Sequence, residues 1–465
     1  MLFPALWLIG AGTPAWAVEE YEVIDLGSLG GNAAEALGLN NRGQVVGWSR
    51  DTDGRMQAFV WQNGSMTGLG FHPGGTSSVA RAINDAGQIT GYSAASSTNR
   101  RAFLYEGGIL QDLGTLGGPD SLGTAINTHG HIAGISMLTN NSPSALDPES
   151  FWWRSNAFVH IPPYNNFSSC NAYGLNDAGR VCGNTFLWAT DGRWWGFVWA
   201  DLNGNGQHDS GEMQVLGSMG VLNSVGSQSA AFDINGLGQV VGYTSVTNTW
   251  YPHHAMLVTP SNGLWKIPAG SPNPSNSLMR NLGTLDGPTN NSYAHAINES
   301  GWIVGTSSTR WGTNQAFLWR DDAMTNLNNL IAPDSGWVLT NATAINEFNE
   351  IAGSGLFQGQ TRAFILRQQG RIARFIPLWV ASTVIATNEQ GQITTQQTAS
   401  VEGQVIEWAG LWAGASTMNF TVEQSADLAG GEWVPVAPSN QWPVQKSIWT
   451  NWPDAPVRFF RVRAD

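Results

Sequence analysis

The sequence is poor in charge and in long apolar runs. Only 12% of its 465 residues are charged, and acidic side chains outnumber basic ones to give a net charge of −13. A protein of that charge repels phosphate backbones and anionic lipid headgroups, which argues against nucleic acid and membrane surfaces as partners. After the N-terminus no stretch approaches the ~18 apolar residues that span a bilayer, so we expect no membrane insertion.

Cysteine is scarce as well. The two cysteines, Cys170 and Cys182, are too few for a disulfide scaffold. If the chain between them forms a hairpin, Cys182 lies opposite residue 174, roughly 13 Å along the strand from Cys170 at ~3.3 Å per residue. A disulfide needs Cα atoms within about 7 Å, so straight strands exclude the bond and only a chain that curls back leaves it open.

Signatures of common enzyme classes are missing. The sequence has no nucleophile motif, no Walker loop and no zinc signature. The histidine pairs at 129 and 131 and at 253 and 254 have no cysteine or carboxylate at ligand spacing, and we interpret them as structural. We predict no catalytic residue, but an enzyme that assembles its site from distant loops stays open as the alternative.

The N-terminus predicts export. "MLFPALWLIGAGTPAWA" is an apolar run that ends in small residues, with Ala15 and Ala17 placed as at a cleavage site before Val18. We assign residues 1–17 to a signal peptide and expect a secreted or cell-surface protein, extracellular or periplasmic. The basic residues that usually precede such a run are lacking, and a buried strand is the alternative.

What the sequence has in abundance is an internal repeat. The pattern small-x-small-(Ile/Leu)-Asn-x-x-Gly-x-(Ile/Val)-x-Gly occurs seven times, with small departures, at intervals of about 43 to 63 residues. Its asparagines are Asn40, Asn84, Asn127, Asn176, Asn235, Asn298 and Asn346. Such intervals are typical of a four-stranded propeller blade with insertions.

Each unit predicts four short strands. A strand such as "AEALGLN" leads into an Asn-x-x-Gly turn and a second strand such as "GQVVGWS". The third strand has the type "QAFVW", "RAFLY" or "NAFVH", and the fourth ends in Leu-Gly. Asn suits the first position of a type I turn and Gly the fourth, where Asn349 of the last unit also tolerates positive φ. The final Gly of the pattern indicates a close approach of backbones in every unit.

Two further positions stand out on the first strand. The residues two and four before each Asn are small, as expected around a crowded axis, with Asp233 as the exception. The residue between them varies, which is typical either of a functional channel or of relaxed packing. These variable residues are Leu37, Arg81, Thr124, Tyr173, Phe232, His295 and Thr343.

The predicted fold is all-β. Residues 18–377 form a seven-bladed β-propeller of four-stranded blades, and residues 378–465, which alternate apolar and polar side chains, form a small β-sandwich domain. The opening "YEVIDLGSLGG" has the pattern of a fourth strand and would close the ring by completing the last blade. Residues 370–377, "GRIARFIP", are the rival for that position.

The units resemble a known repeat. Through "HAMLV", "QAFLW", "LGTLGG" and "AINDAGQI", residues 21 to 370 are similar to the HAF repeat of predicted extracellular repeat proteins. That resemblance implies a β-propeller and export, and it carries no established activity. The C-terminal block resembles β-sandwich modules of secreted bacterial proteins, which attach or present their neighbour.

The segment "DLNGNGQHDSGE" has the ligand spacing of an EF-hand calcium loop. Oxygen donors stand at loop positions 1, 3, 5, 7, 9 and 12, and Gly206 at position 6 permits the sharp turn. These donors are Asp201, Asn203, Asn205, Gln207 (through its backbone carbonyl), Asp209 and Glu212. Because strands flank the loop, we interpret it as a hairpin extension held by a calcium ion. A polar insertion without an ion is the alternative.

Tryptophan is abundant, with 23 residues. Trp61, Trp199 and Trp319 lie at fixed strand positions and are predicted to be core. Others lie off the repeat register and are candidates for exposed aromatics that bind the apolar faces of sugars. These are Trp152, Trp153, Trp194, Trp195, Trp250 and Trp311.

The first functional hypothesis is a secreted, calcium-stabilised propeller that acts as a non-catalytic binding or cell-surface interaction protein, with an extracellular glycan or surface protein as partner. The alternative is a propeller enzyme that acts on extracellular polysaccharide.

Overall fold

The structure is a computed structural model. In the first of two compact units, Met1–Arg367, it describes residues 21–94, 99–138, 148–164, 169–187, 193–219, 228–247, 251–265 and 276–367. In the second, Gln368–Asp465, it describes residues 368, 374–387, 393–407, 420–425, 434–435, 448–451 and 459–464. The expected signal peptide lies outside the described residues, and the expected domain boundary was residue 377.

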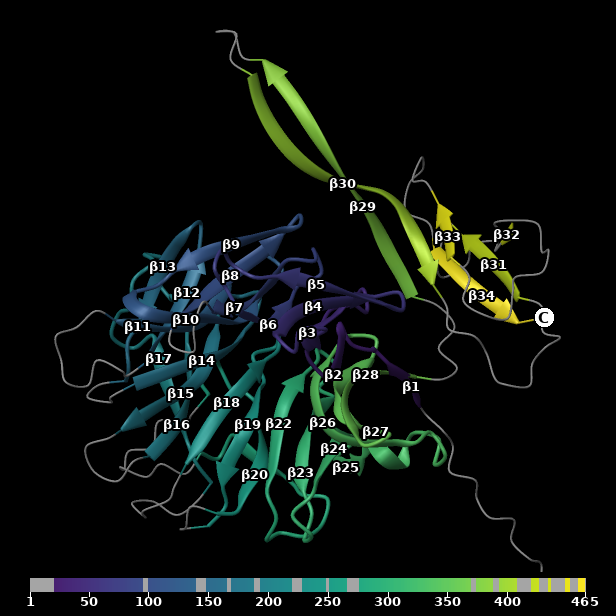
Figure 1. Ribbon diagram of the computed structural model, residues 1–465. Helices are drawn as coiled ribbons and strands as arrows, with labels where there is room; N and C mark the ends of the chain where they lie inside the picture. The colour runs from purple at the N-terminus through teal and green to yellow at the C-terminus, as the bar shows by residue number, and fades with distance from the viewer. Residues whose placement is uncertain are drawn as a thin grey trace, which may run out of the picture. The chain divides into compact units, whose positions relative to one another are not determined.

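The first unit is a seven-bladed β-propeller of four-stranded sheets, which confirms the predicted fold (Figure 1). Blades I to III are β2 (Gly30–Leu39), β3 (Val45–Asp51), β4 (Met56–Gln62), β5 (Ser65–Gly70); β6 (Ser77–Ile83), β7 (Ile89–Ala94), β8 (Arg100–Glu106), β9 (Ile109–Gly114); and β10 (Gly117–Ile126), β11 (Ile132–Leu138), β12 (Pro148–Arg154), β13 (Ala157–Ile161).

Blades IV to VI follow in the same order. They are β14 (Ser169–Leu175), β15 (Val181–Leu187), β16 (Arg193–Trp199), β17 (Met213–Gly217); β18 (Ser229–Ile234), β19 (Val240–Ser245), β20 (His253–Val258), β21 (Met279–Gly283); and β22 (Ser292–Ile297), β23 (Ile303–Ser308), β24 (Asn314–Arg320), β25 (Ala323–Asn326). The 3-10 helix η1 (Leu327–Asn329) leads to blade VII, which contains β26 (Trp337–Ile345), β27 (Ile351–Phe357) and β28 (Gln360–Gln368).

The N-terminal strand closes the ring, as predicted. Blade VII has the strand order β1-β28-β27-β26, so β1 (Tyr21–Asp25) supplies its fourth strand. Tyr21 is fully buried in the core of this blade, and the backbone N–H of Leu26 donates to the carbonyl oxygen of Ala363 over 3.1 Å. The described part of the rival segment, residues 374–377, belongs to a strand of the second unit.

Blade III differs from the prediction. The segment "NAFVH" lies mainly in the fourth strand, β13, whereas the third strand is β12. On β12, Phe151 is the register partner of Gly134, as Phe59 is of Gly47 in blade I. The aromatic residues of "SFWWR" therefore take the place of the expected Ala-Phe motif. The sequence prediction assigned the third strand one strand too late, because "NAFVH" in the fourth strand resembles that motif.

Steric crowding explains the invariant glycine of each second strand. A Cβ atom there would lie between 1.9 and 2.3 Å from a backbone carbonyl oxygen of the first strand. Opposite it, the first strand carries a β-bulge. In each of the seven blades the variable residue has no partner in the strand register. The bulge turns one side chain per blade out of the ladder.

Small residues near the axis allow adjacent blades to touch. A Cβ on Gly38 would lie 2.9 Å from the carbonyl oxygen of Arg81, and a Cβ on Gly174 would lie 2.9 Å from Cα of Asp233. The expected crowding at these positions is confirmed.

The two thiols are buried and free. Cys182 is the register partner of Gly174 and Cys170 that of Thr185, so the cysteines lie apart on the β14–β15 pair as the hairpin register predicts. Burial raises the pKa of Cys170 to about 12, and its Sγ lies 3.1 Å from the carbonyl oxygen of Ile161. It is therefore a core side chain and not a reactive thiol.

The second unit is also all-β. Its described strands form two three-stranded antiparallel sheets, β29-β30-β33 and β32-β31-β34. The strands are β29 (Arg374–Thr387), β30 (Ile393–Glu407), β31 (Phe420–Ser425), β32 (Val434–Pro435), β33 (Ile448–Asn451) and β34 (Phe459–Ala464). In the parts of the chain that are described, no helix has the length and apolar character that a membrane span requires.

Ring closure predicts a large stability loss when residues 21–30 are deleted. The variant loses the buried Tyr21 and Leu26 and exposes the edge of β28. We expect its free energy of unfolding, measured by urea denaturation, to fall by about 3 kcal/mol or more. A synthetic peptide of residues 21–30 should restore part of the loss. A truncated chain as stable as the full one would contradict closure by β1.

Candidate functional site

The asparagines of the repeat turns form a closed ring around the propeller axis. In each turn the Oδ1 atom accepts the backbone N–H four residues ahead over 2.9 to 3.0 Å. Each Nδ2 atom donates to the backbone carbonyl oxygen of the Asn in the next blade over 2.9 to 3.2 Å, and the last bond runs from Asn346 back to Asn40. All seven side chains are buried, so this ring fixes the spacing of the blades.

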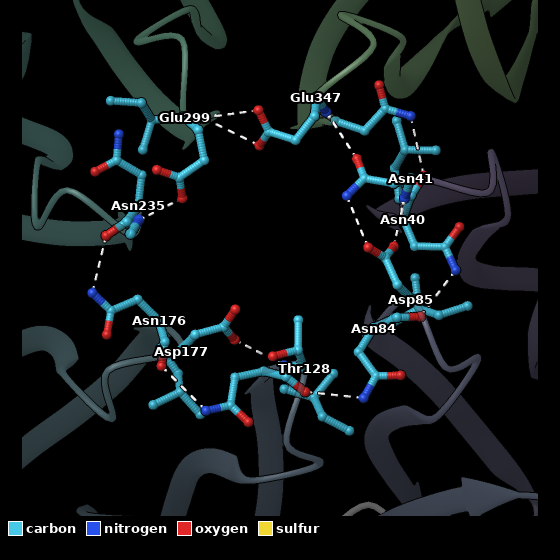
Figure 2. Close-up of a pocket in the computed structure, with 18 of the residues that line it drawn as sticks. Asn40, Asn41, Asn84, Asp85, Thr128, Asn176, Asp177, Asn235, Glu299 and Glu347 are labelled. Atoms are coloured by element: carbon cyan, nitrogen blue, oxygen red, sulfur yellow. Dashed lines mark hydrogen bonds between the residues drawn. The ribbon is translucent and has the colours of Figure 1, made fainter. Parts of the chain in front are cut away.

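A second ring lies one residue further along each turn, and four of its seven members are acidic, which we call the acidic ring (Figure 2). Asp85 accepts the backbone N–H of Asn41 over 2.8 Å, and Asp177 accepts that of Thr128 over 2.9 Å. Glu347 accepts the backbone N–H of Glu299 with both oxygens, at 3.1 and 3.2 Å. Glu299 in turn accepts from the backbone N–H of Gly236. The two rings line a cavity of about 210 Å³ at the axis.

The acidic ring is electrostatically strained at one point. Burial raises the pKa of Glu347, and the negative charges of Glu299 and Asp85 add to the effect. Asp85 uses both carboxylate oxygens on Asn41, through the backbone N–H and the Nδ2 atom. The pocket is thus a set of hydrogen-bond acceptors whose orientation the neighbouring blades fix.

Bulged residues of neighbouring blades contact one another around the axis. The rings of Tyr173 and Phe232 lie 5.5 Å apart edge-to-face, and those of Phe232 and His295 lie 6.1 Å apart. Nδ1 of His295 lies 2.9 Å from the carbonyl oxygen of Ala342, and burial lowers the pKa of this histidine. The variable positions singled out in the sequence therefore pack together near the axis in blades IV to VI.

Asp233 is the one carboxylate at the crowded small-residue position. Its Oδ2 atom accepts the backbone N–H of Ile297 in the next blade over 3.0 Å, and Oδ1 accepts that of Ile234 over 2.8 Å. Burial raises the pKa of Asp233 to about 6, more than these hydrogen bonds lower it. This exception to the repeat links blades V and VI.

The calcium-type loop extends the hairpin between β16 and β17, as predicted. The backbone N–H of Ala200 donates to the carbonyl oxygen of Glu212, which closes the base of the loop. The N–H of Gly206 donates to Oδ2 of Asp201 over 2.9 Å. Asn203 and Asn205 both direct their Nδ2 atoms to Oδ2 of Asp209, at 2.7 and 2.6 Å, so positions 3, 5 and 9 converge on one point.

The donor set fits a hard cation in part. The side chain of Asp201 is 3% exposed, and its buried Oδ1 atom has no hydrogen-bond partner. Glu212 is buried, and its two oxygens accept the backbone N–H groups of Leu202 and Asp209. Among the described residues, no three His, Cys, Asp or Glu side chains cluster closely enough to hold a metal. A calcium ion here would depend on the Asn oxygens and the Gln207 carbonyl as well.

The tryptophans divide into two groups. Trp61, Trp199 and Trp319 are buried, as predicted. Trp152 and Trp153 were expected to be exposed, but they are 5% and 7% exposed because they lie on the third strand of blade III.

The other candidate tryptophans are more accessible. Trp194 and Trp195 on β16 are half-buried, and the ring of Trp194 lies 4.5 Å from that of Phe186. Trp311 is 81% exposed, on a turn held by the ion pair between Arg310 and Asp286. Trp250 lies outside the described residues.

Sequence reasoning missed the acidic ring. Its signal was the residue after each repeat Asn, which is Asp85, Asp177, Glu299 or Glu347 in four of the seven units. Because the turn pattern places every such residue at the same height around the axis, their recurrence could have been recognised as a cluster.

No family model and no curated protein matches the chain. Several solved structures are similar to it at low identity. A prolyl endopeptidase shares 7% identity at a TM-score of 0.45 and is matched over 84% of this chain, which spans 55% of that enzyme's length. A gluconolactonase from Xanthomonas campestris shares 11% identity at a TM-score of 0.34, over 77% of this chain and 93% of that one. The propeller domain of the Trilobed protease from Pyrococcus furiosus shares 10% identity at a TM-score of 0.38, over 62% and 79%.

The raised pKa of Asp233 predicts a pH-dependent stability. A folded pKa of about 6 lies above the unfolded value of about 3.9, so ionisation on passing from pH 4 to pH 7 costs folding energy. We expect Asp233→Asn to gain about 2 kcal/mol relative to the parent over that range. Urea denaturation at several pH values measures the difference. Asp322→Asn, at a side chain that is 73% exposed, is the control with the same charge change. A pH-independent difference for Asp233→Asn would contradict the prediction.

Proposed function

We propose that this protein is a secreted, calcium-stabilised β-propeller that binds an extracellular ligand without chemically changing it. The observation that carries the proposal is the axial pocket, whose acidic side chains are held by backbone N–H groups of neighbouring blades. A side chain fixed in this way is an acceptor whose position does not depend on the ligand. Such preorganisation lowers the entropic cost of binding.

The ligand class that suits the pocket is rich in hydrogen-bond donors. Asp177 and Glu299 each use one oxygen on a backbone N–H, and a carboxylate oxygen pair can accept about four hydrogen bonds. Sugar hydroxyls are such donors, which supports an extracellular glycan as the ligand. The resemblance to extracellular repeat proteins supports the same location. Binding to a protein but to no glycan would instead identify a cell-surface partner.

Trp311 supports a glycan through a different contact. It lies on the turn between β23 and β24, whereas the repeat turns join first and second strands, so the two features lie at opposite ends of an up-and-down blade. An exposed indole face offers apolar stacking area to a sugar ring. The axial pocket and Trp311 are therefore separate surfaces that mutation can test one at a time.

The binding proposal predicts that axial carboxylates set affinity for a glycan. On a glycan array, the pair Asp177→Asn and Glu299→Gln should weaken binding of any captured glycan about tenfold or more, which is the loss of roughly one charged hydrogen bond. Asp322→Asn removes one charge outside the pocket and should bind like the parent. Trp311→Ala measures how much the exposed indole, at the opposite end of the blade from the axial pocket, contributes to glycan binding. Equal binding by the axial variant and the parent would place the ligand elsewhere.

The alternative is a propeller enzyme that acts on extracellular polysaccharide. Glu347, with its raised pKa beside Glu299, is the observation in its favour, because carboxyl groups in unlike environments can serve as acid and base. Release of reducing ends from a bound polymer, lost in Glu347→Gln, would support the enzyme. Binding of the polymer without release would support the binding protein.

Calcium in loop 201–212 is proposed as a structural ion. The buried Oδ1 atom of Asp201, which has no hydrogen-bond partner, supports it. Asn203 and Asn205 lie beside Asp209 but present their Nδ2 atoms to it, so ion binding would require both amides to turn their oxygens inward. Oxygen-only ligands on a turn with Gly206 suit calcium rather than a transition metal. The ion would hold the hairpin that carries β17 at the outer edge of blade IV.

This proposal predicts that chelation destabilises the protein. A free calcium concentration of about one hundred times the dissociation constant adds about 2.7 kcal/mol to the free energy of unfolding. Removing that calcium with EGTA should therefore lower the melting temperature measured by calorimetry. Asp201→Ala should melt at a lower temperature and no longer respond to calcium. Asp53→Ala, at an exposed turn residue, should respond like the parent. A parent protein indifferent to EGTA would refute the ion.

A further inference from the structure

The calcium-type loop has a basic partner from the neighbouring blade. Arg154 ends β12 of blade III, and its Nη2 atom lies 3.0 Å from Oδ2 of Asp201 in the loop of blade IV. Asp201 is the loop's first ligand position, and the same Oδ2 atom accepts the N–H of Gly206. Oδ1 is buried without a partner. One oxygen of this carboxylate is therefore committed to Arg154 and the turn, and the other is left for an ion.

The guanidinium of Arg154 is held in place by packing. It stacks over the ring of Trp152 at 4.4 Å, and Trp152 meets Trp199 edge-to-face at 5.8 Å. The Nε1 atom of Trp199 donates to Nδ1 of His208 over 3.0 Å, at loop position 8. The loop thus contacts blade III directly through Arg154, and indirectly through His208 and Trp199 of its own blade, which packs on Trp152.

The loop is shaped around this arginine. A Cβ atom on Gly206 would lie 3.1 Å from Nη2 of Arg154, so the guanidinium lies directly against the turn at loop position 6. The loop contributes three carboxylates, Asp201, Asp209 and Glu212, and Arg154 offsets one of their charges. The affinity of such loops for calcium follows the ligand charge and the rigidity of the site.

We propose that Arg154 is a built-in counter-charge that keeps loop 201–212 folded without an ion and weakens its affinity for calcium. The inference rests on the calcium ion proposed above. A positive charge beside the first ligand lowers the pull of Asp201 on a second cation and repels that cation directly. The loop thereby binds calcium more weakly than the same ligands would without the arginine. Blade III, through Arg154, then regulates the ion site of blade IV.

The repeat itself supplies the test variant and its control. Gln62 follows Trp61 in blade I as Arg154 follows Trp153 in blade III, so Arg154→Gln introduces a residue that this blade position accepts. Arg320 occupies the same position in blade VI and stacks over Trp302 at 4.7 Å. Arg320→Gln therefore makes the same charge change at an equivalent place outside the loop.

Calcium titration by calorimetry on the full chain measures the effect. We expect Arg154→Gln to bind calcium about tenfold or more tightly than the parent, and Arg320→Gln to bind like the parent. Arg154→Gln without calcium should melt at a lower temperature than the parent, and calcium should raise its melting temperature by more. Arg154→Lys, which keeps the charge, should bind as weakly as the parent.

The possible results separate this inference from the calcium proposal. Calcium binding by the parent, with equal or weaker binding by Arg154→Gln, would overturn the counter-charge and leave the ion site standing. No calcium binding by the parent or by Arg154→Gln would overturn both. If Arg154→Gln does not fold, Arg154→Met keeps the aliphatic stem over Trp152 without the charge, and the same tightening is expected of it.

Discussion

The hydrogen bond from each turn asparagine to the backbone of the next blade is the constraint on which this structure depends. Both ends of the amide are used: its oxygen accepts a backbone N–H of its own turn, and its nitrogen donates to the carbonyl oxygen of the following Asn. A buried amide with a missing partner is costly, so each turn requires its neighbour at a fixed distance. Because Asn346 donates to Asn40, the requirement closes on itself and fixes the number of blades together with β1.

This ring also explains where variation is tolerated. The Asn and the small residues beside it are repeated because a larger or different side chain would break contacts between blades. The glycine of the second strand is repeated because a Cβ atom there would clash with the first strand of its own blade. The residue after the Asn and the bulged residue before it are not limited in this way. The residues after the Asn can therefore form the acidic ring, and the bulged residues can form an aromatic cluster near the axis. The pocket thus gains its chemistry without altering the scaffold that orients it.

Much of the fold could be predicted from the sequence because the same strand and turn pattern occurs seven times. The turns, the invariant glycines, the register of Cys182 and the closing strand are all local patterns with one physical solution. Blade III shows the limit. Its third strand, "SFWWR", satisfies the same packing with Phe151 and Trp153, whereas "NAFVH" copies the expected letters on the wrong strand. A short apolar run indicates a buried strand but does not indicate which strand of the blade it forms.

The site was harder to predict because its parts come from different blades. Spacing alone identified the calcium-type loop, since all its donors are local in sequence. Spacing does not reveal Arg154, which approaches Asp201 only because β12 and the β16–β17 hairpin lie in adjacent blades. In a ring of this kind every blade packs against another blade on each side. The first position of the loop therefore contacts a side chain 47 residues away in the sequence, at the strand end that the ring places beside it.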